Sequence, residues 1–178
     1  MVGEARDTDC AITLWYRKAT EAGPPLVSAF DLSRLASDWS YRFLIAGDKV
    51  VADAVFLVYG TRFARLLDLP AKPLHHLPVL KQVPTRYQTL FGNGYSKVMM
   101  EQAPARFSGA AARCDGKMEL YRVAFMPVQG ARASTCLVLG TFNCRTVAQG
   151  SASDAFQRTQ DQWSDRVRTE GAGRSPEI

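Results

Sequence analysis

The sequence predicts an α+β fold in which strands come before and after a block of helices. Two strand-like runs lie between Tyr41 and Phe56, helical spacing extends from Thr61 to Met99, and further strand-like runs continue to Val147. Such a change of pattern along one chain is typical of an antiparallel sheet with helices packed on it. We therefore expect one small domain with a single core.

The composition agrees with a folded globular protein. Of 178 residues, 47% are apolar and 22% are charged, which is close to the average for soluble domains. The apolar runs fall short of the roughly 20 residues that span a bilayer, and the start of the chain lacks the pattern of a secretory signal. We expect a cytoplasmic protein without membrane insertion. A net charge of +5, spread along the chain, does not specify nucleic-acid binding.

The first element expected is an amphipathic helix from Thr8 to Ala22. Its apolar side chains recur at helical spacing on one face, and a Gly-Pro-Pro triplet ends the helix. These side chains are Ile12, Trp15, Tyr16 and Ala19.

A hairpin is expected next, with strands Tyr41 to Ala46 and Lys49 to Phe56. The dipeptide Gly47-Asp48 between them can adopt the positive φ angles of a tight turn. That turn would place an arginine opposite an aspartate, and one aliphatic side chain opposite another. Cross-strand pairs of these kinds help to fix the register of a hairpin. The pairs are Arg42 with Asp53 and Ile45 with Val50.

Two helices are expected after this hairpin. The first extends from Thr61 to Leu69 and is stopped by prolines, and the longer one extends from Pro84 to Met99. Gly92 and Gly94 lie inside the longer helix, where each costs about 1 kcal/mol relative to alanine. We expect close packing against the sheet, at Phe107 or Met126, to be the reason, and a bound ligand is the alternative.

A second hairpin is expected from Ala105 to Arg113 and from Met118 to Val128. Asp115-Gly116 between these strands is a strong turn signal, and a two-residue turn there would place Phe107 opposite Ala124. Both faces of this hairpin are substantially apolar, so both need cover. We expect the long helix on one face, the N-terminal helix across part of the other, and a last strand over residues 134–147.

The domain boundaries follow changes in composition. We assign residues 1–40 to an N-terminal helical cap, residues 41–147 to the domain, and residues 148–178 to a linker, a short helix and a disordered tail. The tail is polar apart from three apolar side chains that fall on one helical stripe. These are Phe156, Trp163 and Val167.

The order of elements, together with several short phrases, resembles a PAS domain. The phrases include Tyr41-Arg-Phe-Leu-Ile-Ala-Gly47, Val58-Tyr-Gly60 and Asp115-Gly-Lys-Met-Glu-Leu-Tyr-Arg122. More narrowly, they are similar to a bacterial family of single PAS-like domains. The resemblance implies a five-stranded antiparallel sheet of order 2-1-5-4-3, with helices between strands 2 and 3 and a cavity under the long helix. It implies dimerisation through flanking helices and no catalytic residue.

The candidate ligand-binding side chains are those that this cavity would present. Tyrosine and arginine could orient a small acidic or aromatic ligand, and the cofactor is unknown. The candidates are Tyr87, Phe91, Tyr95, Arg122 and Cys136.

Other reactive side chains are expected to be structural. His75 and His76 lie in a proline-rich loop without a third ligand, so we expect loop packing and no metal site. The phrase Asn143-Cys144-Arg145 is similar to the reactive-cysteine phrase of flavin-binding PAS proteins, which place that cysteine on a helix. Here it falls on the last strand, so we expect an inert thiol.

These observations favour a non-enzymatic PAS-like sensor or adaptor in bacterial signalling. It would act through protein contacts or self-association, with a small ligand as a further option. The candidate interface side chains are Trp15, Tyr16, Phe156, Trp163 and Val167. The alternatives are a small α+β cavity enzyme, which would show perturbed ionisable groups, and a basic nucleic-acid-binding protein, which would bind with strong salt dependence.

Overall fold

The fold is taken from a computed structural model that describes residues 4–20, 23–31, 40–47, 51–130 and 136–148. The chain divides into two compact units. The first contains residues 1–108 and 121–144, and the second contains residues 109–120, at the tip of a hairpin, and residues 145–178.

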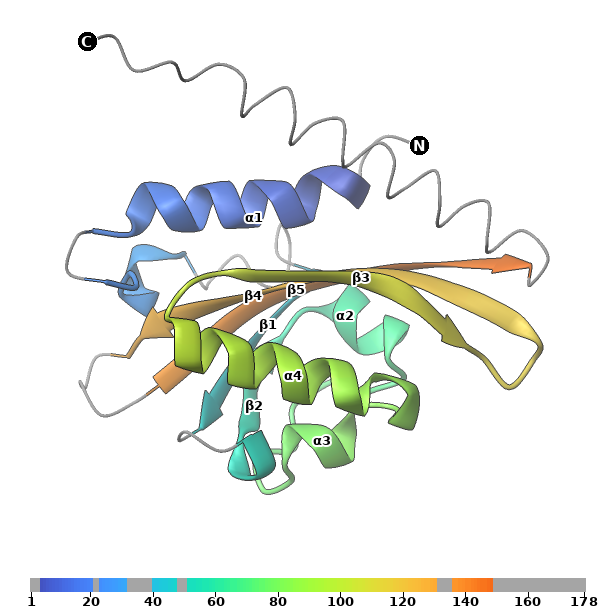
Figure 1. The fold of residues 1–178 in the computed structure, drawn as a ribbon. Coiled ribbons are helices and arrows are strands. Elements are labelled where there is room, and N and C mark those ends of the chain that lie inside the picture. Colours follow the sequence, from blue (N-terminus) through green and yellow to red (C-terminus); the bar gives the residue numbers. More distant parts are fainter. Residues whose placement is uncertain (1–3, 21–22, 32–39, 48–50, 131–135, 149–178) are drawn as a thin grey trace, which may run out of the picture. The chain divides into compact units, whose positions relative to one another are not determined.

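A five-stranded sheet with the order β2-β1-β5-β4-β3 forms the centre of the fold (Figure 1). This order confirms the prediction of 2-1-5-4-3, and β1 pairs antiparallel with both β2 and β5. The strands are β1 (Arg42–Gly47), β2 (Val55–Tyr59), β3 (Ala105–Ala112), β4 (Lys117–Gln129) and β5 (Cys136–Ala148).

The predicted register of the first hairpin is wrong. Phe43 lies opposite Tyr59 and Ala46 opposite Val55, with a bulge in between, so neither Arg42–Asp53 nor Ile45–Val50 is a facing pair. Asp53 instead belongs to a short 3-10 turn, η3 (Val51–Asp53), that precedes β2. A longer connection thus replaces the tight turn expected at Gly47-Asp48.

The second hairpin has a longer turn than predicted. The N–H of Arg113 donates to the carbonyl of Lys117 at 2.9 Å, and the N–H of Gly116 donates to the carbonyl of Arg113 at 3.3 Å. Gly116 has φ +74°, the left-handed conformation that closes a three-residue hairpin loop. At the turn the register is therefore one residue away from the predicted one.

The helices follow the expected order. The N-terminal helix α1 begins and ends earlier than predicted, and the predicted long helix corresponds to α4. The elements are α1 (Glu4–Lys18), α2 (Thr61–Leu66), α3 (Val79–Gln82) and α4 (Thr85–Glu101), with a 3-10 turn η1 (Val27–Ala29) after α1. The predicted tail helix lies outside the described residues.

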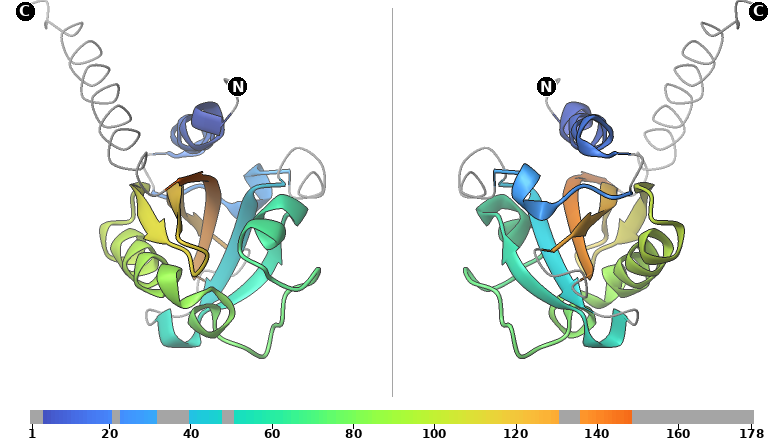
Figure 2. Two further views of the ribbon diagram at one scale, coloured as in Figure 1. Left: turned by 90° about the vertical axis from the view of Figure 1, so that its right-hand side faces the viewer. Right: turned by 90° about the vertical axis from the view of Figure 1, so that its left-hand side faces the viewer.

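Helices cover both faces of the sheet (Figures 1 and 2). Helix α4 lies along one face, which we call the inner face, and α1 lies along the opposite one, the outer face. Contacts establish both placements, because Phe91 of α4 packs on Phe125 of β4, and Trp15 of α1 bonds to the backbone of β4. No helix in the described ranges is long and apolar enough to cross a membrane.

Candidate functional site

Aromatic rings fill the space between α4 and the inner face. The ring of Phe91 lies 5.4 Å from that of Phe43 and 5.5 Å from that of Phe125, measured between centroids. Tyr87 packs edge-on against Phe142 at 5.1 Å. Edge-to-face pairs at these separations contribute beyond the area that they bury. The aromatic core consists of Phe43, Phe56, Phe63, Tyr87, Phe91, Phe125 and Phe142, all fully buried.

Two glycines make room for these rings. A Cβ atom at Gly94 of α4 would overlap the Phe125 ring, whose third-nearest atom, Cζ, would lie only 2.7 Å away. A Cβ atom at Gly140 of β5 would overlap the Phe43 ring in the same way. Close packing therefore accounts for Gly94, although its neighbour is Phe125 and not Phe107 or Met126 as predicted.

The structure brings together three of the five predicted ligand-binding residues. Tyr87, Phe91 and Tyr95 lie on α4 and are fully buried. Arg122 is not with them, because its neighbour Tyr121 contacts Tyr87 and strand alternation places Arg122 on the outer face. Cys136 begins β5, and its side chain lies outside the described residues. The ligand-binding role of these residues stays a prediction.

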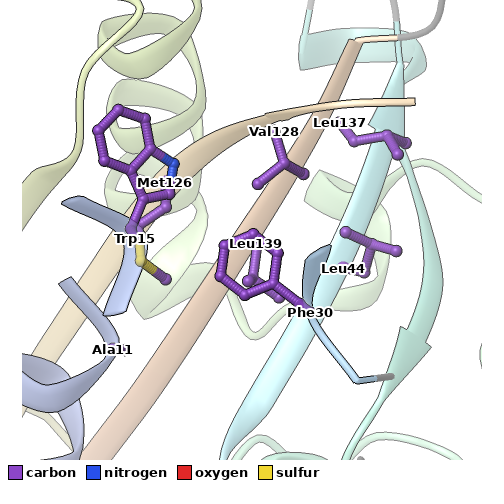
Figure 3. Close-up of a cluster of buried hydrophobic side chains, with 8 residues drawn as sticks. All are labelled: Ala11, Trp15, Phe30, Leu44, Met126, Val128, Leu137 and Leu139. Atoms are coloured by element: carbon purple, nitrogen blue, oxygen red, sulfur yellow. The ribbon is translucent and has the colours of Figure 1, made fainter. Parts of the chain in front are cut away.

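A second cluster joins α1 to the outer face (Figure 3). Trp15 donates a hydrogen bond from Nε1 to the carbonyl of Pro127 at 2.6 Å, with both groups buried. In the same cluster, Leu44 of β1 lies opposite Leu139 of β5. We call this group the outer-face cluster, and its members are Ala11, Trp15, Phe30, Leu44, Met126, Val128, Leu137 and Leu139.

The two predicted interface residues of α1 do not share a face. Trp15 is buried in the outer-face cluster, whereas Tyr16 is 60% exposed and touches Trp15 edge-on at 5.2 Å between centroids. The helical stripe that packs on the sheet contains Thr8, Ala11 and Trp15, so the predicted placement of Tyr16 with Trp15 is wrong. Phe156, Trp163 and Val167 lie outside the described residues.

The outer face becomes polar beyond this cluster. Arg42 lies two residues before Leu44 on β1 and directly opposite Thr141, while Asn143 lies two residues after Thr141 on β5. All three are buried, as is Thr8 on the sheet-facing stripe of α1. We call Arg42, Thr141 and Asn143 the polar end of the outer face.

Three buried polar atoms of Thr8 and Asn143 have no hydrogen-bond partner among the described residues. They are Oγ1 of Thr8 and both Nδ2 and Oδ1 of Asn143. A buried unsatisfied group costs about 1 to 3 kcal/mol, so proteins rarely retain several together. Sequence reasoning missed this group, because Asn143 drew attention only through the phrase around Cys144, and the pairing of Arg42 with Asp53 was wrong.

The tip of the second hairpin carries an ionic cluster within its own compact unit. Arg113 Nη1 donates to Oε1 of the buried Glu119 at 2.7 Å, and Arg113 Nε lies 3.4 Å from Asp115 Oδ1. The hydrogen bond to Glu119 raises the pKa of Arg113 above its usual range, with Asp115 adding to the effect. Burial alone would raise the pKa of Asp115, but the N–H of Lys117 and the nearby cations lower it.

The two histidines lie in the loop before α3. Nδ1 of His75 lies 2.9 Å from the carbonyl oxygen of Phe56 on β2, the edge strand, and so contributes to loop packing as predicted. Within the described part of the chain, no three side chains of histidine, cysteine, aspartate or glutamate are grouped as a metal site requires. Cys144 lies on β5, as expected, and not on a helix.

Comparison with known proteins gives similarity in structure only. No protein-family model and no curated protein sequence matches the chain. A solved PAS domain of an HTR-like protein from Haloarcula marismortui is 13% identical with a TM-score of 0.39, and the match covers 65% of this chain and 88% of that one.

Two further solved structures contain LOV domains. A fungal LOV domain photoreceptor is 13% identical with a TM-score of 0.41, covering 79% of this chain and 94% of that one. An RNA-binding light-oxygen-voltage receptor is 13% identical with a TM-score of 0.42, covering 85% of this chain and 42% of that one. The strand order and the helices between β2 and β3 give this chain a PAS-like fold.

Proposed function

We propose that this chain is a non-enzymatic PAS-like sensor or adaptor that acts through protein contacts made by α1. The observation that carries the proposal is the division of α1 into two sides. One side is buried against the outer-face cluster through Trp15, and the other presents Tyr16, which is 60% exposed. The setting in bacterial signalling comes from the resemblance alone.

The free energy with which α1 docks on the outer face is small enough for a partner to change it. Burial of a large apolar side chain contributes about 1.5 to 3 kcal/mol, and the hydrogen bond from Trp15 to Pro127 adds about 1 kcal/mol. The unsatisfied atoms of Thr8 and Asn143 oppose docking. A net docking energy of a few kcal/mol lies within the range that the binding of a partner can overcome.

The aromatic core supports an adaptor more than a sensor with a ligand at the inner face. Tyr87 and Phe91 touch rings from the sheet directly, so a molecule placed between α4 and the sheet would have to displace them. Close-packed cores resist such a change, since added volume forces side chains away from their preferred rotamers.

The proposal is tested on the full chain by native mass spectrometry and sedimentation velocity. We expect a concentration-dependent dimer in which the exposed side of α1 takes part, and mass spectrometry also reports any retained small molecule. Replacing Tyr16→Ser should weaken the dimer at least tenfold. Met100→Ser is the matched control, because Met100 is 81% exposed but lies on α4.

A monomer at all concentrations would contradict self-association through α1, as would equal weakening by the two substitutions. Both altered side chains are largely in solvent, so neither substitution should change the fold. Circular dichroism and the melting temperature check this point. A dimer lost only in Tyr16→Ser would support the adaptor proposal.

A further inference from the structure

The two edges of the sheet differ in how they are covered. At the β2 edge, the N–H of Val79 donates to the carbonyl of Ala54 at 2.7 Å, and Nδ1 of His75 lies 2.9 Å from the carbonyl oxygen of Phe56. The bulge in the pairing of β1 with β2 adds to this cover. Covering loops and bulges prevent an edge strand from pairing with another chain. The β2 edge is therefore protected.

The opposite edge is formed by β3, which is open along the described part of the chain. The N–H of Arg113 donates to the carbonyl of Lys117 at 2.9 Å, which determines the residues of β3 that bond to β4. Because bonded residues alternate in an antiparallel pair, every second residue before Arg113 directs its N–H and C=O groups away from the sheet. These residues are Ser108, Ala110 and Ala112, and all three are exposed. The strand also contains neither proline nor lysine, the residues that commonly protect an edge.

Helix α1 presents Tyr16 on the side of the β3 edge. Asp9 of α1 forms an ion pair with Arg106 of β3, with Oδ1 and Nη2 2.5 Å apart. Tyr16 follows Asp9 by seven residues, which is almost two helical turns, so both side chains lie on one stripe of α1. A second copy that contacts the exposed ring of Tyr16 therefore meets the open edge strand from the same side.

The sequence of β3 suits pairing with a second copy of itself. In an antiparallel arrangement about a twofold axis at Ala110, this residue faces its own equivalent, and Ser108 faces the partner's Ala112. All the outward backbone groups of these residues are then paired, in about six hydrogen bonds between the copies. Each flanking arginine falls opposite an uncharged residue, which avoids the like-charge contacts that weaken sheet pairing. These pairs are Arg106 with Cys114 and Arg113 with Phe107.

We propose that β3 pairs with β3 of a second copy, antiparallel and centred on Ala110, in the same dimer that the exposed side of α1 forms. The inference rests on the proposed function, because it supplies the orientation of the two copies for a contact made by Tyr16. Backbone hydrogen bonds along β3 determine the register, and Tyr16 adds a side-chain contact. The edge-to-edge contact is symmetric, so it closes after two copies.

Disulfide crosslinking tests the register. The starting chain carries Cys10→Ser and Cys114→Ser, which remove two exposed thiols, and then receives either Ala110→Cys or Ala112→Cys. The two residues 110 would have Cα atoms about 5.5 Å apart, which suits a disulfide. The two residues 112 would be displaced by four residues, or about 13 Å along the strand. Under mild oxidation, Ala110→Cys should form a covalent dimer at least tenfold faster than Ala112→Cys.

A proline at the same position tests the hydrogen bonds. The N–H that Ala110→Pro removes points away from β4, so the fold should be kept, and circular dichroism checks this. The dissociation constant of the dimer, measured by sedimentation velocity, should rise at least tenfold. Ala110→Val is the matched control, because it keeps the N–H at the same exposed position and should change the dissociation constant by less than threefold.

The results separate the two proposals. If no dimer forms, both are overturned. A dimer that depends on Tyr16 but crosslinks equally well at residues 110 and 112, or is unaffected by Ala110→Pro, would overturn the pairing of β3 alone. Preferential crosslinking of Ala110→Cys that slows at least tenfold when Tyr16→Ser is added would support a single dimer made by β3 and α1.

Discussion

The packing of α4 on the sheet makes Gly94→Ala the most informative single substitution. In open helix, alanine is favoured over glycine by about 1 kcal/mol. Here the new Cβ atom would overlap the Phe125 ring, with even the third-nearest ring atom at 2.7 Å. That ring is fully buried and packs against Phe91, Phe43 and Phe107 at 5.5, 5.6 and 6.0 Å, so it has little room to move.

Overpacking of a tight core costs about 1 to 3 kcal/mol, and an overlap this close belongs at the upper end of that range. After the gain in helix propensity, Gly94→Ala should destabilise the protein by about 2 kcal/mol. For a chain of this size, that loss corresponds to a melting temperature lower by about 4 to 8 °C.

Gly92 provides a matched control on the same helix. Nothing lies within 4 Å of a Cβ atom built at Gly92, so Gly92→Ala should stabilise the protein by about 1 kcal/mol. Urea unfolding followed by circular dichroism measures both variants. If Gly94→Ala proves as stable as Gly92→Ala, then α4 does not pack closely on Phe125, and the argument for a filled aromatic core fails with it.

Three further predictions concern other parts of the fold. Trp15→Phe keeps the apolar contact but loses the hydrogen bond to β4, so it should cost about 1 kcal/mol and increase amide hydrogen exchange in α1. Burial raises the pKa of Tyr121 above 10.0, so above this pH the unfolded chain loses the phenol proton more readily than the folded protein does. The free energy of unfolding should therefore fall as the pH rises above 10.0. Tyr121→Phe should make this fall smaller, as measured by urea unfolding at several pH values. Arg113→Gln removes a partner of the buried Glu119 and should lower the melting temperature in thermal unfolding, whereas Lys117→Gln, at an exposed position, should leave it nearly unchanged.

The sequence was sufficient to predict most elements and their order, although the short helix α3 was not predicted. The helical spacing of Tyr87, Leu90 and Phe91 predicted α4, because a helix packed on a sheet must carry its apolar side chains on one side. Alternation and turn residues predicted the strands. The sheet order itself came from the resemblance to PAS domains, since spacing alone does not determine which strands are neighbours.

Register was harder to predict, for a physical reason. Gly47-Asp48 has the composition of a tight turn, but the aromatic side chains of the hairpin have to reach the inner face. In the observed register Phe43 and Phe56 meet edge-on at 6.0 Å, and both contact Phe91 on α4. Burial of these rings outweighs the preference of Gly47-Asp48 for a tight turn. The connection between β1 and β2 is therefore longer and contains η3.

The polar end of the outer face could not be predicted for a related reason. The alternation of residues along one strand predicts which of them share a face of the sheet. Arg42 and Asn143, however, are neighbours only because β1 lies beside β5, and these two strands are far apart in the sequence. The incorrect pairing of Arg42 with Asp53 in the first hairpin also directed attention away from these polar residues. Groups made by strands far apart in the chain can be recognised only when strand pairing and burial are known together.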